Sequence, residues 1–175
     1  MKKSDKIKKQ AEETMSKIRF ITRHIRNVED NCLILGERLI SQGEIELGKQ
    51  LVAHGFVHDA SKFYGIEWEN IVPDISSEQI ENKAIKLKMA IHQHQKTNPH
   101  HVEYWSNGIS EMPDVYLAEL VCDIKARSEE FGTSLMDYID TKGIKRWKIT
   151  KDDESYKKII RFVKLLCDQP FQEIK

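Results

Sequence analysis

Apolar residues recur every three or four positions along the first 41 residues, which is the spacing of one face of an α-helix. The apolar positions are Ile7, Ala11, Met15, Ile18, Ile21, Ile25, Val28, Cys32, Leu35 and Leu39. This pattern predicts either one long helix over about residues 4–41 or two helices that meet in a bend near residues 27–31. His24 falls at the edge of the apolar stripe, where it can point inward as a hydrogen-bonded core residue or as a ligand.

The remaining helices are predicted from the same spacing and from residues that begin or end helices. Gln42 and Gly43 interrupt the pattern, and Pro113 suits the first position of a later helix. Ser77 is expected to cap the helix that follows residues 64–76, an irregular stretch read as a short helix and a loop. Helices are expected at residues 44–57, 77–94, 113–131, 134–140 and 153–167. Because no strand alternation is present, the sequence predicts an all-α fold, a single domain over residues 1–175 whose last helix serves packing only.

Composition narrows the function classes. Lys+Arg and Asp+Glu are balanced at 28 each among 175 residues, so there is no global signal for a nucleic-acid partner. No secretory segment and no apolar run of membrane length is found, which predicts a cytoplasmic protein without a membrane partner. Cys32, Cys122 and Cys167 lack metal-ligand spacing and are expected to be reduced, small core residues.

The pair His58-Asp59 is the strongest candidate for chemistry. It stands at the end of a predicted helix, directly after the apolar run at residues 51–57. An imidazole nitrogen and a carboxylate oxygen are ligands that a divalent metal accepts together. Lys62, three residues after the aspartate, would place a cation near an anion held by such a metal.

Two later segments carry further candidates. Residues 96–108 are rich in His, Trp, Tyr and Asn, and Pro99 prevents a helix from continuing through them, which predicts a binding loop. Asp123 lies within an apolar helix, where a carboxylate needs a partner because burying it alone is costly. Either an ion pair with Arg127 or a metal ion would supply that partner.

In this order, His24, His58-Asp59 and Asp123 resemble the signature of the HD-domain superfamily of metal-dependent phosphohydrolases, an all-helical fold. The segment Gly-Phe-Val-His-Asp-Ala-Ser-Lys is also similar to the Gly-Leu-Leu-His-Asp-x-x-Lys form of that superfamily. The resemblance covers about residues 20–127. The phrases His-Asp-x-Ser-Lys-Phe, Asn-Pro-His-His-x-Glu-Tyr-Trp and Arg-Ser-x-Glu-Phe-Gly are closest to small HD-like proteins of bacteria and their phages, for which the resemblance implies no substrate.

The resemblance implies a set of metal ligands. His24, His58, Asp59 and Asp123 would bind a first metal ion. Members with two metals add two histidines between the His-Asp pair and the last aspartate, and Asp59 then bridges the ions. His92, together with His101 or His100, stands where those histidines are expected. His92 follows Ile85 and Met89 on one face and is expected to point inward, whereas His94 is expected to face away. The cofactor would be one or two divalent ions (Mn, Co, Mg, Fe or Zn).

The resemblance also implies roles around the metal. Asp59 would act with Lys62 and Arg127 in catalysis, the two cations neutralising the phosphoryl group, although Arg127 can instead form a plain ion pair with Asp123 or Glu130. Residues expected to contact the substrate are Lys62, His100, Tyr104, Trp105 and Arg127. For the two aromatic residues, core packing is the alternative.

Three function classes follow. The first is a phosphohydrolase, either a monoesterase or a diesterase, that uses a metal-activated water on a nucleotide or another small phosphorylated compound. The second is a catalytically idle metal-binding or interaction module, and the third is a mixed-valent di-iron oxygenase of the HD type. The sequence is also compatible with a homodimer.

Overall fold

Helices make up the fold, and no strand occurs in the part of the chain that the structure describes. The computed structural model describes residues 3–70 and 80–167. The prediction of an all-α fold is confirmed. α1 (Lys3–Ser41) is one continuous helix, so the long-helix alternative is the one observed. The cap predicted at Ser77 lies outside the described residues.

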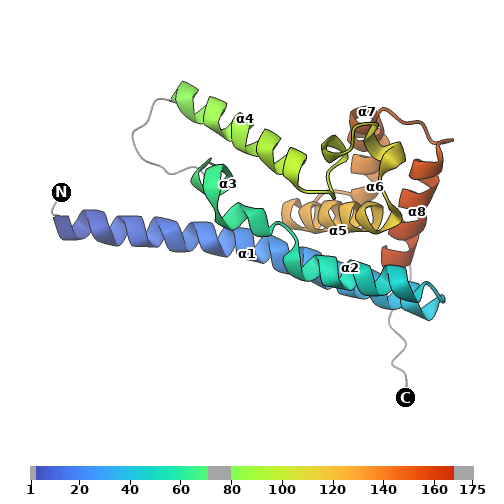
Figure 1. Cartoon of the computed structure of the whole chain (residues 1–175). Helices are drawn as coiled ribbons and strands as arrows, with labels where there is room; N and C mark the ends of the chain where they lie inside the picture. The colour runs from blue at the N-terminus through green and yellow to red at the C-terminus, as the bar shows by residue number, and fades with distance from the viewer. Residues whose placement is uncertain (1–2, 71–79, 168–175) are drawn as a thin grey trace, which may run out of the picture.

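α1 and α2 (Ile45–Val57) form an antiparallel helical hairpin (Figure 1). Gly43 makes the turn between them with a φ of 90°, a conformation that costs glycine little. The two helices approach closely because glycines face each other. A Cβ atom at Gly48 would lie 2.5 Å from the carbonyl oxygen of Gly36. The hairpin therefore leaves no room for a side chain at this crossing, and α2 is held in a fixed position along α1.

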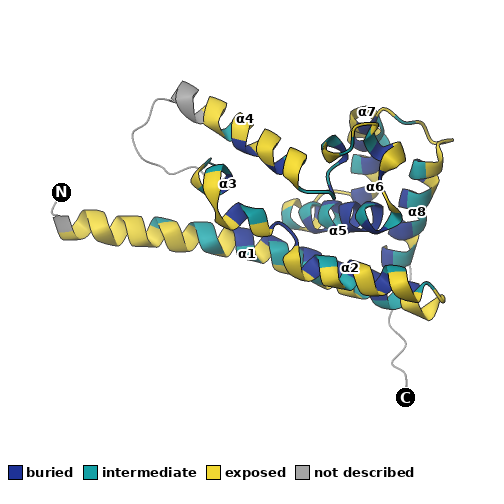
Figure 2. Cartoon of the chain, in the orientation of Figure 1, coloured by how far each residue is buried: buried dark blue, intermediate teal, exposed yellow. Residues whose placement is uncertain are grey.

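α5 (Asp114–Phe131) forms the centre of the core, and Figure 2 shows it buried over most of its length. It contacts α1, α2 and α8 (Glu154–Cys167). α8 crosses the end of the bundle and buries Ile159, Phe162 and Val163 against α1 and α5. Most residues in the first two-thirds of α5 are buried, among them Leu117, Leu120 and Val121, and these side chains place the helix in the interior.

One further long helix, α4, and several short elements connect these helices. They are η1 (Ala60–Phe63), α3 (Gly65–Asn70), α4 (Ile80–Thr97), η2 (Val102–Tyr104), η3 (Gly108–Glu111), α6 (Leu135–Tyr138), a π-helical turn (Ile139–Gly143) and α7 (Ile144–Trp147). α4 continues to Thr97 and so passes the end that the sequence suggested near residues 92–94. The break comes only where Pro99 restricts the backbone of Asn98.

The cysteines are reduced, as expected, but they are not all in the core. Cys32 and Cys122 are buried, whereas Cys167 is exposed. The expectation of a core position is wrong for Cys167, because its neighbour Leu166 takes the buried position in the last turn of α8.

The N-terminal end of α1 extends beyond the other helices (Figure 2). Most side chains of residues 4–20 are exposed there. In the described ranges, none of the helices combines the length and the apolar character that crossing a membrane requires.

The glycine contact between α1 and α2 can be tested with Gly48→Ala. Alanine is the better helix former by about 1 kcal/mol, so an isolated helix would gain stability. In this chain the added methyl group meets a backbone oxygen that cannot turn aside, and we expect a net loss of about 1–3 kcal/mol in the free energy of unfolding. Chemical denaturation measures it. Lys49→Ala, at the exposed neighbouring position, is the control, and equal stability of both variants would contradict the packing argument.

Candidate metal centre

Five of the seven histidines and two aspartates meet inside the bundle, brought together from segments far apart in the sequence. α1 contributes His24, the end of α2 contributes His58 and Asp59, α4 contributes His94, the turn after α4 contributes His100 and His101, and α5 contributes Asp123. His101 and Asp123 are half-buried, and the other members are buried. We call these seven residues the His/Asp cluster.

Asp59 lies at the centre of the His/Asp cluster. Its φ of 55° is in the left-handed region, which aspartate tolerates better than most residues. Its Oδ1 atom lies 3.1 Å from Nε2 of His94 and 3.4 Å from Nε2 of His100. Its Oδ2 atom lies 3.4 Å from Nε2 of His58 and 3.6 Å from Nε2 of His24. The two oxygens thus face different pairs of histidines.

This arrangement produces overlapping groups of donor atoms that could hold a metal ion. Asp59 forms one group with His24 and His58 and another with His94, His100 and His101. In each group the donor atoms lie within 4.8 Å of one another. Asp123 forms a third group with His58 and His100, and its Oδ1 atom lies 3.1 Å from Nε2 of His24.

The donor atoms of the cluster fit a divalent metal ion. The Nε2 atoms of His24, His58, His100 and His101 are buried without a hydrogen-bond partner, as is Oδ1 of Asp59. Buried polar atoms are normally satisfied, because an unpaired one costs about 1–3 kcal/mol. Several such atoms gathered at one place, all of them imidazole nitrogens or carboxylate oxygens, are the donor set of a metal site.

Glu119 on α5 contacts histidines through their Nδ1 atoms and thereby orients their rings. Its Oε1 atom accepts a hydrogen bond from Nδ1 of His58 at 2.9 Å and lies 3.3 Å from Nδ1 of His100. Its Oε2 atom accepts from Nδ1 of the half-buried His54 at 2.9 Å. A carboxylate on Nδ1 fixes the tautomer and leaves the Nε2 lone pair for a metal.

Two further glutamates do the same for other members of the cluster. Glu67 accepts from Nδ1 of His94 at 2.7 Å and from the hydroxyl of Ser61 at 3.0 Å. Glu130 accepts from Nδ1 of His24 at 3.0 Å. Each of these histidines therefore presents its Nε2 atom to the centre with a carboxylate directly behind it.

Charges in the cluster set the protonation of its members. Burial alone would raise the pKa of Asp59, but the charges of His58 and Lys62 hold it well below its usual value. Burial and the neighbouring charge of His100 lower the pKa of His101 to about 2. Asp59 is therefore ionised and His101 is neutral near pH 7, the states in which these two residues bind a metal. Although burial alone would lower the pKa of His58, the charge of Asp59 raises this pKa above its usual value, so a metal bound by this ring would displace a proton.

The structure brings most of the expected ligands together, with one exchange. Those in the cluster are His24, His58, Asp59, His100, His101 and Asp123. His92 is exposed, so the expectation that it points inward is wrong, and His94 takes its place. The stripe of Ile85 and Met89 that suggested the orientation faces solvent, with 55% of each residue exposed. Residues two apart on a helix differ by about 200° in direction, so only one of the two histidines can face the centre.

Lys62 and Arg127, the two cations expected at the site, pair with different carboxylates. Lys62 is buried, and its ammonium group contacts Oδ2 of Asp59. Arg127 donates to Oε2 of Glu130 at 2.9 Å rather than pairing with Asp123. Of the two ion pairs considered for Arg127, the one with Glu130 is thus observed, and Glu130 links it to His24.

Tyr104 and Trp105 do not line the cavity beside the cluster. Trp105 donates from Nε1 to the carbonyl oxygen of Pro99 at 2.8 Å, and its ring packs 5.7 Å from that of Tyr116. Tyr104 is 43% exposed. The structure therefore gives Trp105 the packing role, and this contact holds the turn that carries His100 and His101.

His94 and the three glutamates behind the histidines were not predicted as residues of the site. For two of the glutamates a signal existed. Glu119, Asp123 and Glu130 follow one another at intervals of four and seven residues, so they share a face of the apolar helix α5. The argument that a carboxylate in such a helix needs a partner applies to all three. Glu67, in the six-residue helix α3, has no comparable signal.

A cavity of about 470 Å³ adjoins the cluster at His101 and Asp123. The rest of its wall consists of apolar side chains, three cations and three hydroxyl groups: Val102, Leu120, Ile124, Arg127, Ser128, Phe131, Thr133, Tyr138, Lys142, Arg146 and Trp147. A volume of this size is within the range of small-molecule sites. The cluster is thus accessible to a ligand considerably larger than a single phosphate group.

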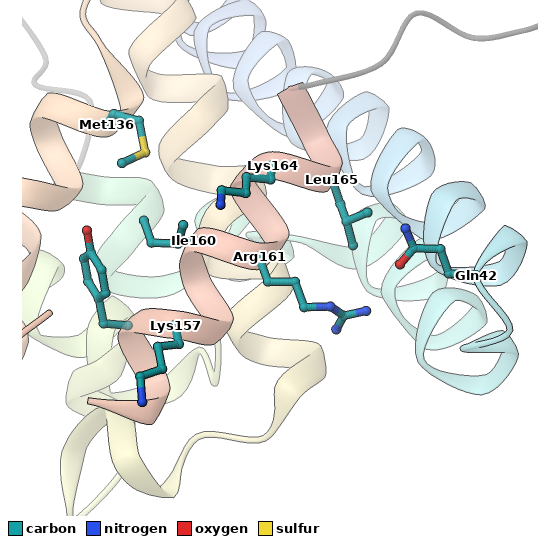
Figure 3. A pocket seen from close by; sticks show the side chains of 8 residues that line it. Gln42, Met136, Lys157, Ile160, Arg161, Lys164 and Leu165 are labelled. Atoms are coloured by element: carbon teal, nitrogen blue, oxygen red, sulfur yellow. The ribbon is translucent and has the colours of Figure 1, made fainter. Parts of the chain in front are cut away.

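A larger cavity of about 600 Å³ lies apart from the cluster, against α8 (Figure 3). It is lined by Gln42, Met136, Tyr156, Lys157, Ile160, Arg161, Lys164 and Leu165. No member of the His/Asp cluster belongs to its wall, so size alone does not identify the candidate site.

Because His94 rather than His92 faces the cluster, the two residues should differ in their effect on metal binding. His94→Ala should lower the metal content of the purified protein, because one donor of the second group is lost. His92→Ala, a matched change two residues away at an exposed position, should leave it unaltered. Elemental analysis of both variants measures this, and the reverse result would restore His92 as the ligand.

Glu119 is expected to control metal affinity without binding the metal. Glu119→Gln replaces a carboxylate that several imidazoles share with a neutral amide, and we expect metal affinity to fall by about 10–100-fold. Titration with a competing chelator measures the affinity. Glu129→Gln makes the same chemical change on an exposed part of α5, and a similar loss in this control would count against the orienting role.

Comparison with known proteins identifies a family for the chain but no activity. No curated protein and no solved structure matches it. A family model described as a family of unknown function (DUF5662) matches residues 13–165, a span that contains the whole His/Asp cluster. The chain therefore belongs to the family DUF5662.

Proposed function

We propose that this protein is a metal-dependent phosphohydrolase that acts on a nucleotide or another small phosphorylated compound. The observation that carries the proposal is the convergence of unpartnered Nε2 atoms and Asp59 at the edge of a cavity with cationic side chains in its wall. The resemblance of His24, His58-Asp59 and Asp123 to the HD-domain signature supports the same reading.

The donor groups favour two metal ions with Asp59 between them. His24, His58 and Asp123 would complete the ligands on the Oδ2 side. His94, His100 and His101 would complete those on the Oδ1 side. When bound, a divalent metal lowers the pKa of a water molecule and polarises phosphoryl oxygens, which is the chemistry that phosphate ester hydrolysis needs.

Arg127 is placed to bind the phosphoryl group. It lines the cavity together with Asp123, and Glu130 holds its guanidinium group from the other side. Apolar neighbours such as Leu120 and Ile124 lower the local dielectric constant, which strengthens the attraction between a guanidinium group and a phosphate.

Lys62 has a different role from Arg127. It is buried and neutralises Asp59 by direct contact. If Asp59 held a metal ion, the ammonium group of Lys62 would be available for a substrate oxygen. Lys62 would then neutralise charge in the reaction, whereas Tyr104 and Trp105, which do not line the cavity, would have no part in it.

A di-iron oxygenase is the second candidate. The observation that favours it is the carboxylate of Asp59 between two groups of histidines, a donor set that also suits iron. The metal that the protein retains, and the metal that supports activity, separate the two candidates.

The proposal is tested by elemental analysis of the purified protein followed by a screen of phosphate esters with added manganese. We expect close to two equivalents of metal and hydrolysis of at least one phosphate ester. Asp59→Ala should abolish both, because Asp59 belongs to both donor groups. Asp30→Ala, at an exposed position on α1, is the matched control and should change neither.

Arg127→Ala separates metal binding from catalysis. The metal content should be unchanged, whereas kcat should fall by about 10²–10³-fold because a charge that stabilises the transition state is lost. Iron retention without any hydrolysis would favour the oxygenase. Full metal content and activity in Asp59→Ala would overturn the central assignment.

A further inference from the structure

The cavity beside the His/Asp cluster is lined by two cations that the metal chemistry does not need, and we call this pair, Lys142 and Arg146, the cationic end. Lys142 lies in the π-helical turn, and Arg146 lies one turn later on α7. Both line the cavity, as do His101 and Asp123 of the cluster. Two cations four residues apart repel each other on a helix, so their common orientation toward a cavity has a cost.

Resting on the phosphohydrolase function, we propose that Lys142 and Arg146 form a second anion site that defines the substrate class. The substrate is a phosphate ester whose leaving group carries a second acidic group, a phosphate or a carboxylate. Its reacting phosphoryl group lies at the His/Asp cluster with Arg127, and its second acidic group lies at Lys142 and Arg146.

The charge balance of the cavity supports this assignment. Arg127 is paired with Glu130 at 2.9 Å, and Arg146 is paired with Glu103 at 2.8 Å. For Lys142, no ion pair with another described residue occurs. Apart from the metal ligand Asp123, no carboxylate is part of the wall. Lys142 is therefore the cation of the wall that no carboxylate of a described residue compensates, and an anionic ligand would do so.

The geometry of Arg146 points in the same direction. Its Nε atom donates to Oε1 of Glu103. This ion pair holds the side chain at the cavity. A pre-positioned guanidinium group recognises phosphates and carboxylates well.

The apolar part of the wall indicates what joins the two anionic groups. Besides the cluster members and the cations, the wall includes Leu120, Ile124, Phe131 and Trp147. Such a surface suits an apolar or aromatic body, which removes its area from water when it binds. The volume of about 470 Å³ is more than a phosphate group alone would fill.

The test uses two matched pairs of substrates with the metal-loaded protein. Adenosine 5′-monophosphate is compared with adenosine 3′,5′-bisphosphate, and phenyl phosphate with 4-carboxyphenyl phosphate. In at least one pair, we expect the KM of the substrate with two acidic groups to be about 10-fold lower, the effect of one charge-assisted hydrogen bond. A preference within the nucleotide pair would show that the second anion site binds a phosphate. A preference within the phenyl phosphate pair would show that it binds a carboxylate.

Variants assign this preference to the cationic end. Lys142→Ala should remove it while leaving the KM of the singly acidic substrate and the metal content unchanged. Arg146→Gln, which retains a donor for Glu103, should weaken it. Lys145→Ala removes a neighbouring exposed lysine outside the cavity wall and should behave as the unaltered protein. Absence of a preference in both pairs, or a preference that survives in Lys142→Ala, would overturn the proposal.

Failure of the proposed function would be recognised separately. If no phosphate ester is hydrolysed with any metal, calorimetric titration with adenosine 3′,5′-bisphosphate and with the monophosphate still reports the second anion site. Tighter binding of the bisphosphate that depends on Lys142 would retain the site without the hydrolase. Equal binding of the two nucleotides would contradict both the second anion site and the phosphohydrolase function.

Discussion

The ionised carboxylate of Asp59, buried and held in a left-handed backbone conformation, is the constraint on which the rest of the structure depends. A charge in that position is tolerated only when partners surround it. Four histidines and Lys62 do so, and they come from separate segments of the chain. The bundle must therefore bring α1, the end of α2, α4 and the following turn to one point before the carboxylate is satisfied.

α5 joins the core and the site in one element. One side of this helix presents Glu119, Asp123 and Glu130 to the histidines, while Leu117 and Val121 are among its residues packed in the core. A shift of α5 that loosened the core would also move the carboxylates behind the imidazoles. Packing therefore fixes the geometry of the donor atoms, as a metal site requires of its supporting residues.

Most of the fold and part of the site followed from the sequence. Helical periodicity predicted the all-α fold, and the order of His24, His58-Asp59 and Asp123 predicted which distant residues would meet. The choice of His92 over His94 failed because Ile85 and Met89 are exposed apolar residues, which periodicity cannot distinguish from a buried stripe. The contact partners of Glu67 and Trp105 depend on tertiary packing, which spacing along one helix does not encode.

The contact between Lys62 and Asp59 has a consequence for the order of assembly. Since the polypeptide supplies its own counter-ion for this buried carboxylate, the charge of Asp59 is compensated within the chain itself. Folding would then not have to wait for a metal ion, in contrast to small zinc domains that are unfolded without their ion. A chain that reaches its final shape first would take up whichever suitable ion its surroundings supply.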